Sequence, residues 1–222
     1  MRQIVSILII LSFVACKKKQ TALDLGYNYV PLDSGITTIF QVRDIFHDVA
    51  LIPAHDTNYY QIKTVVGESY EDDEGIIAHK IYRYRRETSV DSWTVKDVWT
   101  LRNTGTRIEI TEENLRLIDF VFAPSITKTW DANALNEFEA KNSVFKSVHK
   151  PFKQNAFSFD STCVVSHQAF TSFIDHNVEY DVFAKGLGKI HSVHKELTID
   201  NFDTLDIQKG FEITYELIDF SK

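Results

Sequence analysis

The sequence has few of the residues that cross-link or interrupt a chain. Its 222 residues include only two cysteines, four prolines, eight glycines and one methionine. If Cys16 carries a lipid, Cys163 has no partner within the chain, so an intramolecular disulfide is excluded and packing alone must hold the fold. The scarcity of proline and glycine argues against a loop-rich structure, and the lone methionine argues against a soft, methionine-lined binding surface.

An excess of positive charge and a long apolar run are also missing. The formal net charge is −7, and it becomes about −8 once Arg2 is removed with a leader peptide, so no nucleic-acid partner is expected. The apolar run Ile4–Val14 has 11 residues, whereas a membrane-spanning helix needs about 20. With 44% hydrophobic and 25% charged residues, the rest of the chain has the composition of a globular protein.

The N-terminus predicts export and a lipid anchor. A basic residue followed by a short apolar run is typical of a secretory signal, and Ala15-Cys16 resembles the lipobox of bacterial lipoproteins. We therefore expect a signal peptide over residues 1–15, a lipidated Cys16, and a flexible tether to residue 28. Lys17-Lys18-Lys19 can lie near anionic lipid head groups, and this favours a protein on the outer membrane that faces the periplasm.

From Tyr29 onward the sequence alternates apolar and polar residues with a period of two, which is typical of half-buried strands. No segment has a sustained helical pattern. The expected strands are Thr37–Phe46, Tyr59–Tyr70, Ile76–Glu87, Trp93–Arg102, Thr106–Thr111, Leu115–Phe122, Glu137–Val148, Phe157–His167, Val178–Ala184, Lys189–Leu197 and Phe211–Phe220.

The fold class that follows is all-β, with little helix. Turn residues at 71–75 and 103–105 favour hairpins, so sequential strands should pair antiparallel. A meander of about 9–11 strands is too large to stay flat, and it must curl into a barrel, a half-barrel or two packed layers. We expect a single domain over residues 29–222, with a concave face that can hold a ligand.

One strand carries a dense run of arginines. We expect Lys80–Arg86 to be half-buried, with its arginine face on a solvated sheet surface. The arginines should pair with acidic neighbours such as Glu109 or Asp119, and a phosphate site there is the less favoured alternative.

Three stretches together resemble a family of uncharacterised Bacteroidetes lipoproteins. Residues 29–35 (Tyr-Val-Pro-Leu-Asp-Ser-Gly) are similar to its Y-x-P-L-x-x-G turn, and residues 182–188 (Val-Phe-Ala-Lys-Gly-Leu-Gly) are similar to its Y/F-A-x-G-x-G segment. The aromatic hairpins between Ile81 and Trp130 are similar to the centre of the same family. Thr38 departs from the tryptophan expected in the first strand. The resemblance implies an envelope location and a curled antiparallel sheet, and it implies no reaction.

No catalytic, metal or cofactor motif is expected. The densest group of possible ligands is Asp44, His47, Asp48, His55 and Asp56, but it needs a special fold-back to converge because strand neighbours point to opposite faces. His191 and His194 should be separated across the sheet for the same reason. Cys163 lies mid-strand, where a cysteine is usually a small buried apolar side chain.

Aromatic residues make up 13% of the chain, and several could line the concave face. The candidates for a groove are Tyr59, Tyr82, Tyr84, Trp93, Trp99 and Trp130. The function this favours is a non-catalytic binding or carrier module for an apolar ligand. An accessory subunit of an envelope protein complex is the first alternative, and a hydrolase with an unrecognised site is the second.

Overall fold

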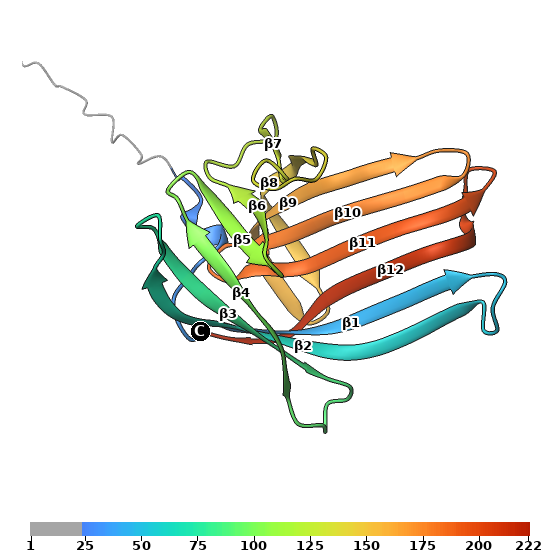
Figure 1. Cartoon of the computed structure of the whole chain (residues 1–222), viewed down its shortest axis with the longest axis horizontal. Coiled ribbons are helices and arrows are strands. Elements are labelled where there is room, and N and C mark those ends of the chain that lie inside the picture. The colour runs from blue at the N-terminus through green and yellow to red at the C-terminus, as the bar shows by residue number, and fades with distance from the viewer. Residues whose placement is uncertain (1–23) are drawn as a thin grey trace, which may run out of the picture.

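The computed structural model describes residues 24–222; the expected signal peptide, Cys16 and most of the tether lie outside these residues. Twelve antiparallel strands form one curled sheet, and the short 3-10 helix η1 (Tyr27–Tyr29) precedes it (Figure 1). The prediction of a single curled all-β sheet is confirmed. No helix within residues 24–222 is long and apolar enough to span a bilayer.

Every expected strand is present, and one short strand is added. The strand bounds are β1 (Thr37–Asp48), β2 (His55–Glu71), β3 (Ile77–Arg86), β4 (Thr94–Asn103), β5 (Arg107–Glu112), β6 (Leu115–Val121), β7 (Thr129–Asp131), β8 (Asn142–Gln154), β9 (Phe157–Thr171), β10 (Asp175–Ala184), β11 (Gly188–Asp200) and β12 (Asp203–Ser221). The addition is β7, whose three residues are too few for an alternating pattern to be recognised.

The strand order brings the two ends of the sheet almost together. It runs β6-β5-β4-β3-β2-β1-β12-β11-β10-β9-β8-β7, so β6 and β7 are the edges. Two hydrogen bonds bridge them: the Ile118 amide donates to the carbonyl of Ala132 at 2.9 Å, and the Trp130 indole donates to the carbonyl of Ile118 at 3.0 Å. The sheet is therefore a nearly closed barrel, and its concave face becomes an interior.

The segment before β1 closes one end of this interior. Tyr29 is fully buried, and its hydroxyl is hydrogen-bonded to His149 and Ser161, both at 2.7 Å. The carbonyl of Leu25 accepts a hydrogen bond from the Ala123 amide, so the ordered domain includes residues that the sequence pattern assigned to the tether. The domain thus begins before Tyr29.

A cluster of aromatic rings forms the centre of the core next to this segment. Phe120 is fully buried, and its ring lies 5.0 Å from Phe183 and 5.2 Å from Phe145. The twelve strands described in residues 24–222 and this core give the segment what a domain needs to fold alone.

The arginine face of β3 is not the solvated surface that the sequence predicted. Arg83 is only 5% exposed and points inward beside Ile81, while Tyr82 and Tyr84 lie on the outer face. Its ion-pair partner is Asp97, on the neighbouring strand β4. The expected partners are engaged elsewhere: Glu109 pairs with other arginines, and Asp119 pairs with Lys189.

Candidate ligand-binding cavity

A cavity of about 590 Å³ lies inside the curled sheet. Its wall comes from β1–β6, β9–β12 and the segment before β1, because inward side chains of all these elements face the same interior. Most of the wall is apolar, and the lining includes Leu32, Phe40, Ile62, Ile110 and Ile213. The volume falls in the range of about 300–1,000 Å³ that is typical of small-molecule sites. The interior of this sheet is therefore not filled by its own side chains.

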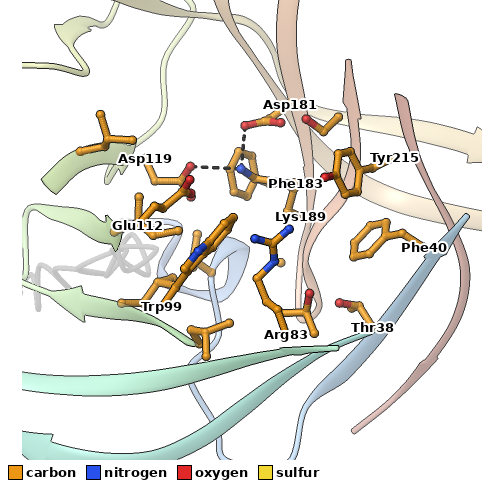
Figure 2. A pocket seen from close by; sticks show the side chains of 18 of the residues that line it. Thr38, Phe40, Arg83, Trp99, Glu112, Asp119, Asp181, Phe183, Lys189 and Tyr215 are labelled. Atoms are coloured by element: carbon orange, nitrogen blue, oxygen red, sulfur yellow. Dashed lines mark hydrogen bonds and ion pairs between the residues drawn. The ribbon is translucent and has the colours of Figure 1, made fainter. Parts of the chain in front are cut away.

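One side of the cavity carries a cluster of charged side chains that the sequence did not predict to lie together. Lys189 Nζ lies 2.8 Å from Asp181 and 3.2 Å from Asp119, as the dashed lines in Figure 2 mark. Burial alone would lower the pKa of Lys189, but the charges of the two aspartates outweigh it and raise that pKa. Burial likewise opposes ionisation of Asp181, and Lys189 and His167 reverse this and lower its pKa. Lys189 and Asp181 are therefore both charged at neutral pH.

Arg83 lines the cavity opposite these aspartates. Its Nη1 donates to both carboxylate oxygens of Asp97, at 3.2 and 3.3 Å, and its guanidinium carbon lies 3.6 Å from the centre of the Trp99 ring. Asp97 also accepts from Lys96, so this carboxylate is shared by two cations. Stacking on an indole and an ion pair together hold the guanidinium at the cavity wall.

Glu112 is the unusual acid of the site. Burial is the largest influence on its carboxyl and raises the pKa to about 7, with Asp119 and Asp181 raising it further and Lys189 and Arg83 opposing them. A carboxyl of this kind is half protonated near neutral pH, so it can either donate a hydrogen bond or receive a cation.

The raised pKa of Glu112 has a cost in stability that can be measured. Its ordinary pKa is 4.5, so the stability from its protonated form is complete below pH 4.5 and is lost as pH rises to about 7. We expect wild-type residues 24–222 to lose about 1–2 kcal/mol of unfolding free energy between pH 5 and pH 8 through this group. Glu112→Gln should remove that loss.

Urea unfolding at pH 5 and pH 8 measures the difference. Glu179→Gln is a suitable control, because Glu179 also lines the cavity but is paired with Lys141 at 2.6 Å. If the unfolding free energy depends equally on pH in wild type and Glu112→Gln, the raised pKa does not belong to Glu112.

A serine, a histidine and an aspartate form a hydrogen-bonded row at the cavity wall. Ser143 Oγ lies 2.7 Å from His167 Nδ1, and His167 Nε2 lies 3.3 Å from Asp181. The composition is that of a hydrolytic triad, but Ser143 is fully buried, and His167 and Asp181 line the cavity whereas Ser143 does not. A nucleophile must reach its substrate, and the Ser143 hydroxyl instead fixes the orientation of His167.

Of the six aromatic residues predicted to line a groove, one does so. Trp99 lines the cavity. Trp130 packs on Phe145 at 5.0 Å in the core. The other four lie on the outer face of β2–β4: Tyr59 is 60% exposed, Tyr82 is hydrogen-bonded to Glu68, and Lys63 stacks on both Tyr84 and Trp93.

The alternating pattern held a signal for the residues that were missed. Arg83 follows Ile81 by two positions, Glu112 follows Ile110, and Asp181 precedes Phe183. Each charged side chain is therefore two positions from a core residue and points to the same face of its strand. A charged residue at such a position means either that the register of the strand is assigned wrongly or that the side chain faces an interior site.

Two of the histidines considered as metal ligands lie side by side in the structure. The β1–β2 hairpin pairs His47 with His55, and their Nδ1 atoms lie 2.8 Å apart, so two of the five possible ligands lie together. His47 Nε2 also lies 3.1 Å from Glu212. Even so, no group of three or more His, Cys, Asp or Glu side chains among residues 24–222 is arranged to hold a metal ion.

Cys163 is fully buried in β9, as its mid-strand position predicted. Burial raises the pKa of its thiol, so the reactive thiolate is disfavoured.

Comparison with known proteins adds a similarity of shape. No family model and no curated protein matches the chain. Among solved structures, it is similar to a protein from Bacteroides fragilis NCTC 9343 described as a "putative exported protein with YmcC-like fold". The two share 10% sequence identity and a TM-score of 0.47, over 87% of this chain and 98% of the other.

Proposed function

We propose that this chain is a lipid-anchored protein of the bacterial envelope that binds an apolar small molecule and does not catalyse a reaction. The observation that carries the proposal is the 590 Å³ cavity, whose wall is mostly apolar. The apolar run Ile4–Val14 and the Ala15-Cys16 pair support export and anchoring, and Lys17–Lys19 supports a position on the outer membrane that faces the periplasm.

Membership of the Bacteroidetes lipoprotein family is part of the proposal. Its two turn motifs, residues 29–35 and 182–188, meet at one end of the cavity. The Gly186 amide donates to the carbonyl of Asn28 at 2.6 Å, and Val30, Pro31, Leu32 and Leu187 all line the cavity. A shared role in closing the interior is a physical reason for these two motifs to occur together.

Binding of a neutral apolar fluorophore tests the function. N-phenyl-1-naphthylamine should bind residues 24–222 saturably, at one site, with enhanced emission. Ile213→Trp places a larger side chain into the cavity from β12, and we expect it to weaken this binding at least tenfold. Circular dichroism verifies that the variant keeps its sheet.

The matched control is Ile77→Trp, since Ile77 is 53% exposed at the start of β3. It should leave the affinity unchanged. Absence of saturable binding to the wild type, or equal affinity in both variants, would remove the proposed function.

A second function, as accessory subunit of an envelope complex, is favoured by one surface. The hairpin tips β1–β2, β9–β10 and β11–β12 share one end of the molecule (Figure 1), and the Phe202 amide donates to the carbonyl of Phe173 between two of them. Large apolar side chains are exposed on these tips: Val49, Leu51, Ile52, Phe173, Ile174, Phe202 and Leu205. Exposed apolar groups at one end of a soluble domain are typical of an interaction surface.

Crosslinking in cells tests this second function. A photoreactive amino acid at Ile52 or Leu205, which are 101% and 89% exposed, should give one discrete protein adduct from both positions. Val90 is 90% exposed at the β3–β4 turn and serves as the control position. If Val90 gives the same adduct, or the tips give none, the tips are not a specific contact.

A further inference from the structure

Two charged groups of the cavity wall lack a full set of partners, and they have opposite sign. The Arg83 side chain is 6% exposed, and within residues 24–222 its hydrogen bonds use Nη1 alone. In Figure 2 its guanidinium reaches into the cavity toward Lys189. The Nε and Nη2 hydrogens therefore remain available to an acceptor in the cavity.

Glu112 supplies the opposite charge. Among residues 24–222 its carboxyl takes part in no hydrogen bond or ion pair, and only burial and longer-range charges act on it. It comes from the end of β5, and Figure 2 shows it beside Asp119 at the same polar side of the cavity. A partly buried carboxylate without a partner is unfavourable, so this position favours a ligand that carries a cation.

The ion pairs around Arg83 and Glu112 do not balance. Positive charge is in excess near Arg83, and negative charge is in excess near Glu112. Arg83 and Lys96 share the single carboxylate of Asp97, which leaves positive charge at Arg83. Asp119 and Asp181 share the ammonium of Lys189, and Asp181 also lies 3.3 Å from His167 Nε2. Among residues 24–222, Asp119 has no second cation in an ion pair, so negative charge remains beside Glu112. A purely anionic ligand would face Glu112 and Asp119, and a purely cationic ligand would leave Arg83 unmatched.

We propose that the cavity binds a zwitterionic amphiphile, with a primary ammonium at Glu112, a phosphate or carboxylate at Arg83, and a hydrocarbon chain along the apolar wall. The proposal rests on the proposed binding function and names its ligand class. Arginine suits the anionic group because its planar fork matches carboxylate and phosphate geometry. A primary ammonium suits Glu112 because it brings three donors to a carboxylate.

Displacement of N-phenyl-1-naphthylamine from residues 24–222 tests the ligand class. The probes share a 12-carbon chain: lysophosphatidylethanolamine and Nε-lauroyl-lysine carry both charges, lysophosphatidic acid lacks the ammonium, and dodecylamine lacks the anion. We expect at least one zwitterion to bind about tenfold more tightly than either singly charged probe, as one charge-assisted hydrogen bond provides. The two zwitterions separate a phosphate from a carboxylate at Arg83.

Variants of each charged group connect the preference to its residue. Glu112→Gln should reduce the affinity for the zwitterion to that for lysophosphatidic acid, and Arg83→Met should reduce it to that for dodecylamine. If Arg83→Met does not fold, Arg83→Lys keeps a cation near Asp97 but removes the fork, and it should still lose most of the preference. Lys63→Met, on the outer face, is the control and should change nothing.

The pH profile gives an independent readout. Glu112 must be ionised to hold an ammonium, so zwitterion binding should tighten as pH rises through about 7 in wild type and stay level in Glu112→Gln. The other charged groups that face Glu112 are Asp119 on β6, Asp181 on β10, Lys189 on β11 and Arg83 on β3, and they are present in both proteins.

The outcomes distinguish this inference from the function on which it rests. Fluorophore binding should persist in Lys63→Met, and its absence in wild type overturns the binding function itself. Fluorophore binding with equal affinity for all four amphiphiles, or a zwitterion preference that survives Glu112→Gln, overturns the ligand class alone.

Discussion

Glu109→Ala is expected to lower the unfolding free energy of residues 24–222 by about 3–5 kcal/mol, the cost of breaking a buried ion pair. The Glu109 side chain is 1% exposed, and three arginines surround it. Arg102 Nε, Arg107 Nη2 and Arg116 Nη2 each lie 2.6 Å from one of its oxygens. Removing the carboxylate leaves these guanidinium groups close together without their central anion.

The network of ion pairs extends beyond Glu109. Arg102 also contacts Asp72 at 2.6 Å and Glu74 at 2.9 Å, so the acidic β2–β3 turn is tied to β4. The sequence predicted a hairpin turn at residues 71–75, and the structure shows that ion pairs connect this turn to β4.

Urea unfolding at pH 7 measures the cost. Glu87→Ala is the control, because the pair of Glu87 with Arg85 is 64% and 39% exposed and should contribute less than about 1 kcal/mol. If Glu109→Ala lowers the unfolding free energy no more than Glu87→Ala does, burial does not make the Glu109 ion pairs more important for stability.

Cys16→Ser in the full chain is expected to abolish fatty-acid labelling and to release the protein from the membrane fraction. The expectation comes from the sequence, where Ala15-Cys16 follows the apolar run. Only a cysteine supplies the thiol that carries the lipid, so the effect should be complete.

Cys163 provides a matched control for the labelling. Its thiol is fully buried in β9, and its pKa is raised by burial, so Cys163→Ala should keep full labelling and membrane association. Cells fed an alkynyl fatty acid, followed by dye conjugation and fractionation, measure both outcomes. Labelling that persists in Cys16→Ser would contradict the anchor.

The sequence predicted the strands well because their signals are local. Alternation within β1 to β6 and the turn residues at 71–75 and 103–105 lie within a few positions of each other. The prediction that Arg83 lies on a solvated face was wrong, because the signal that decides this is not local. Alternation divides a strand into two faces, but it does not say which face becomes concave, and Tyr82 and Tyr84 were compatible with either.

The aromatic groove residues illustrate the same limit. The sequence predicted that Tyr84 and Trp93 line a groove, but Lys63 Nζ lies 4.5 Å and 4.9 Å from their ring centres and covers them on the outer face. A cation on an aromatic ring stabilises it at a partly exposed position, and sequence spacing across two strands gives no sign of this contact.

The sequence by itself determined that this chain forms an antiparallel meander that must curl, because period-two patterning and hairpin turns are properties of short segments. Only the tertiary structure decided what the curl encloses. Arg83, Glu112, Asp119, Asp181 and Lys189 come from five strands, and Figure 2 places all five around one cavity. Their meeting depends on strand order, register and near closure of the sheet, which are fixed by contacts between residues far apart in the chain.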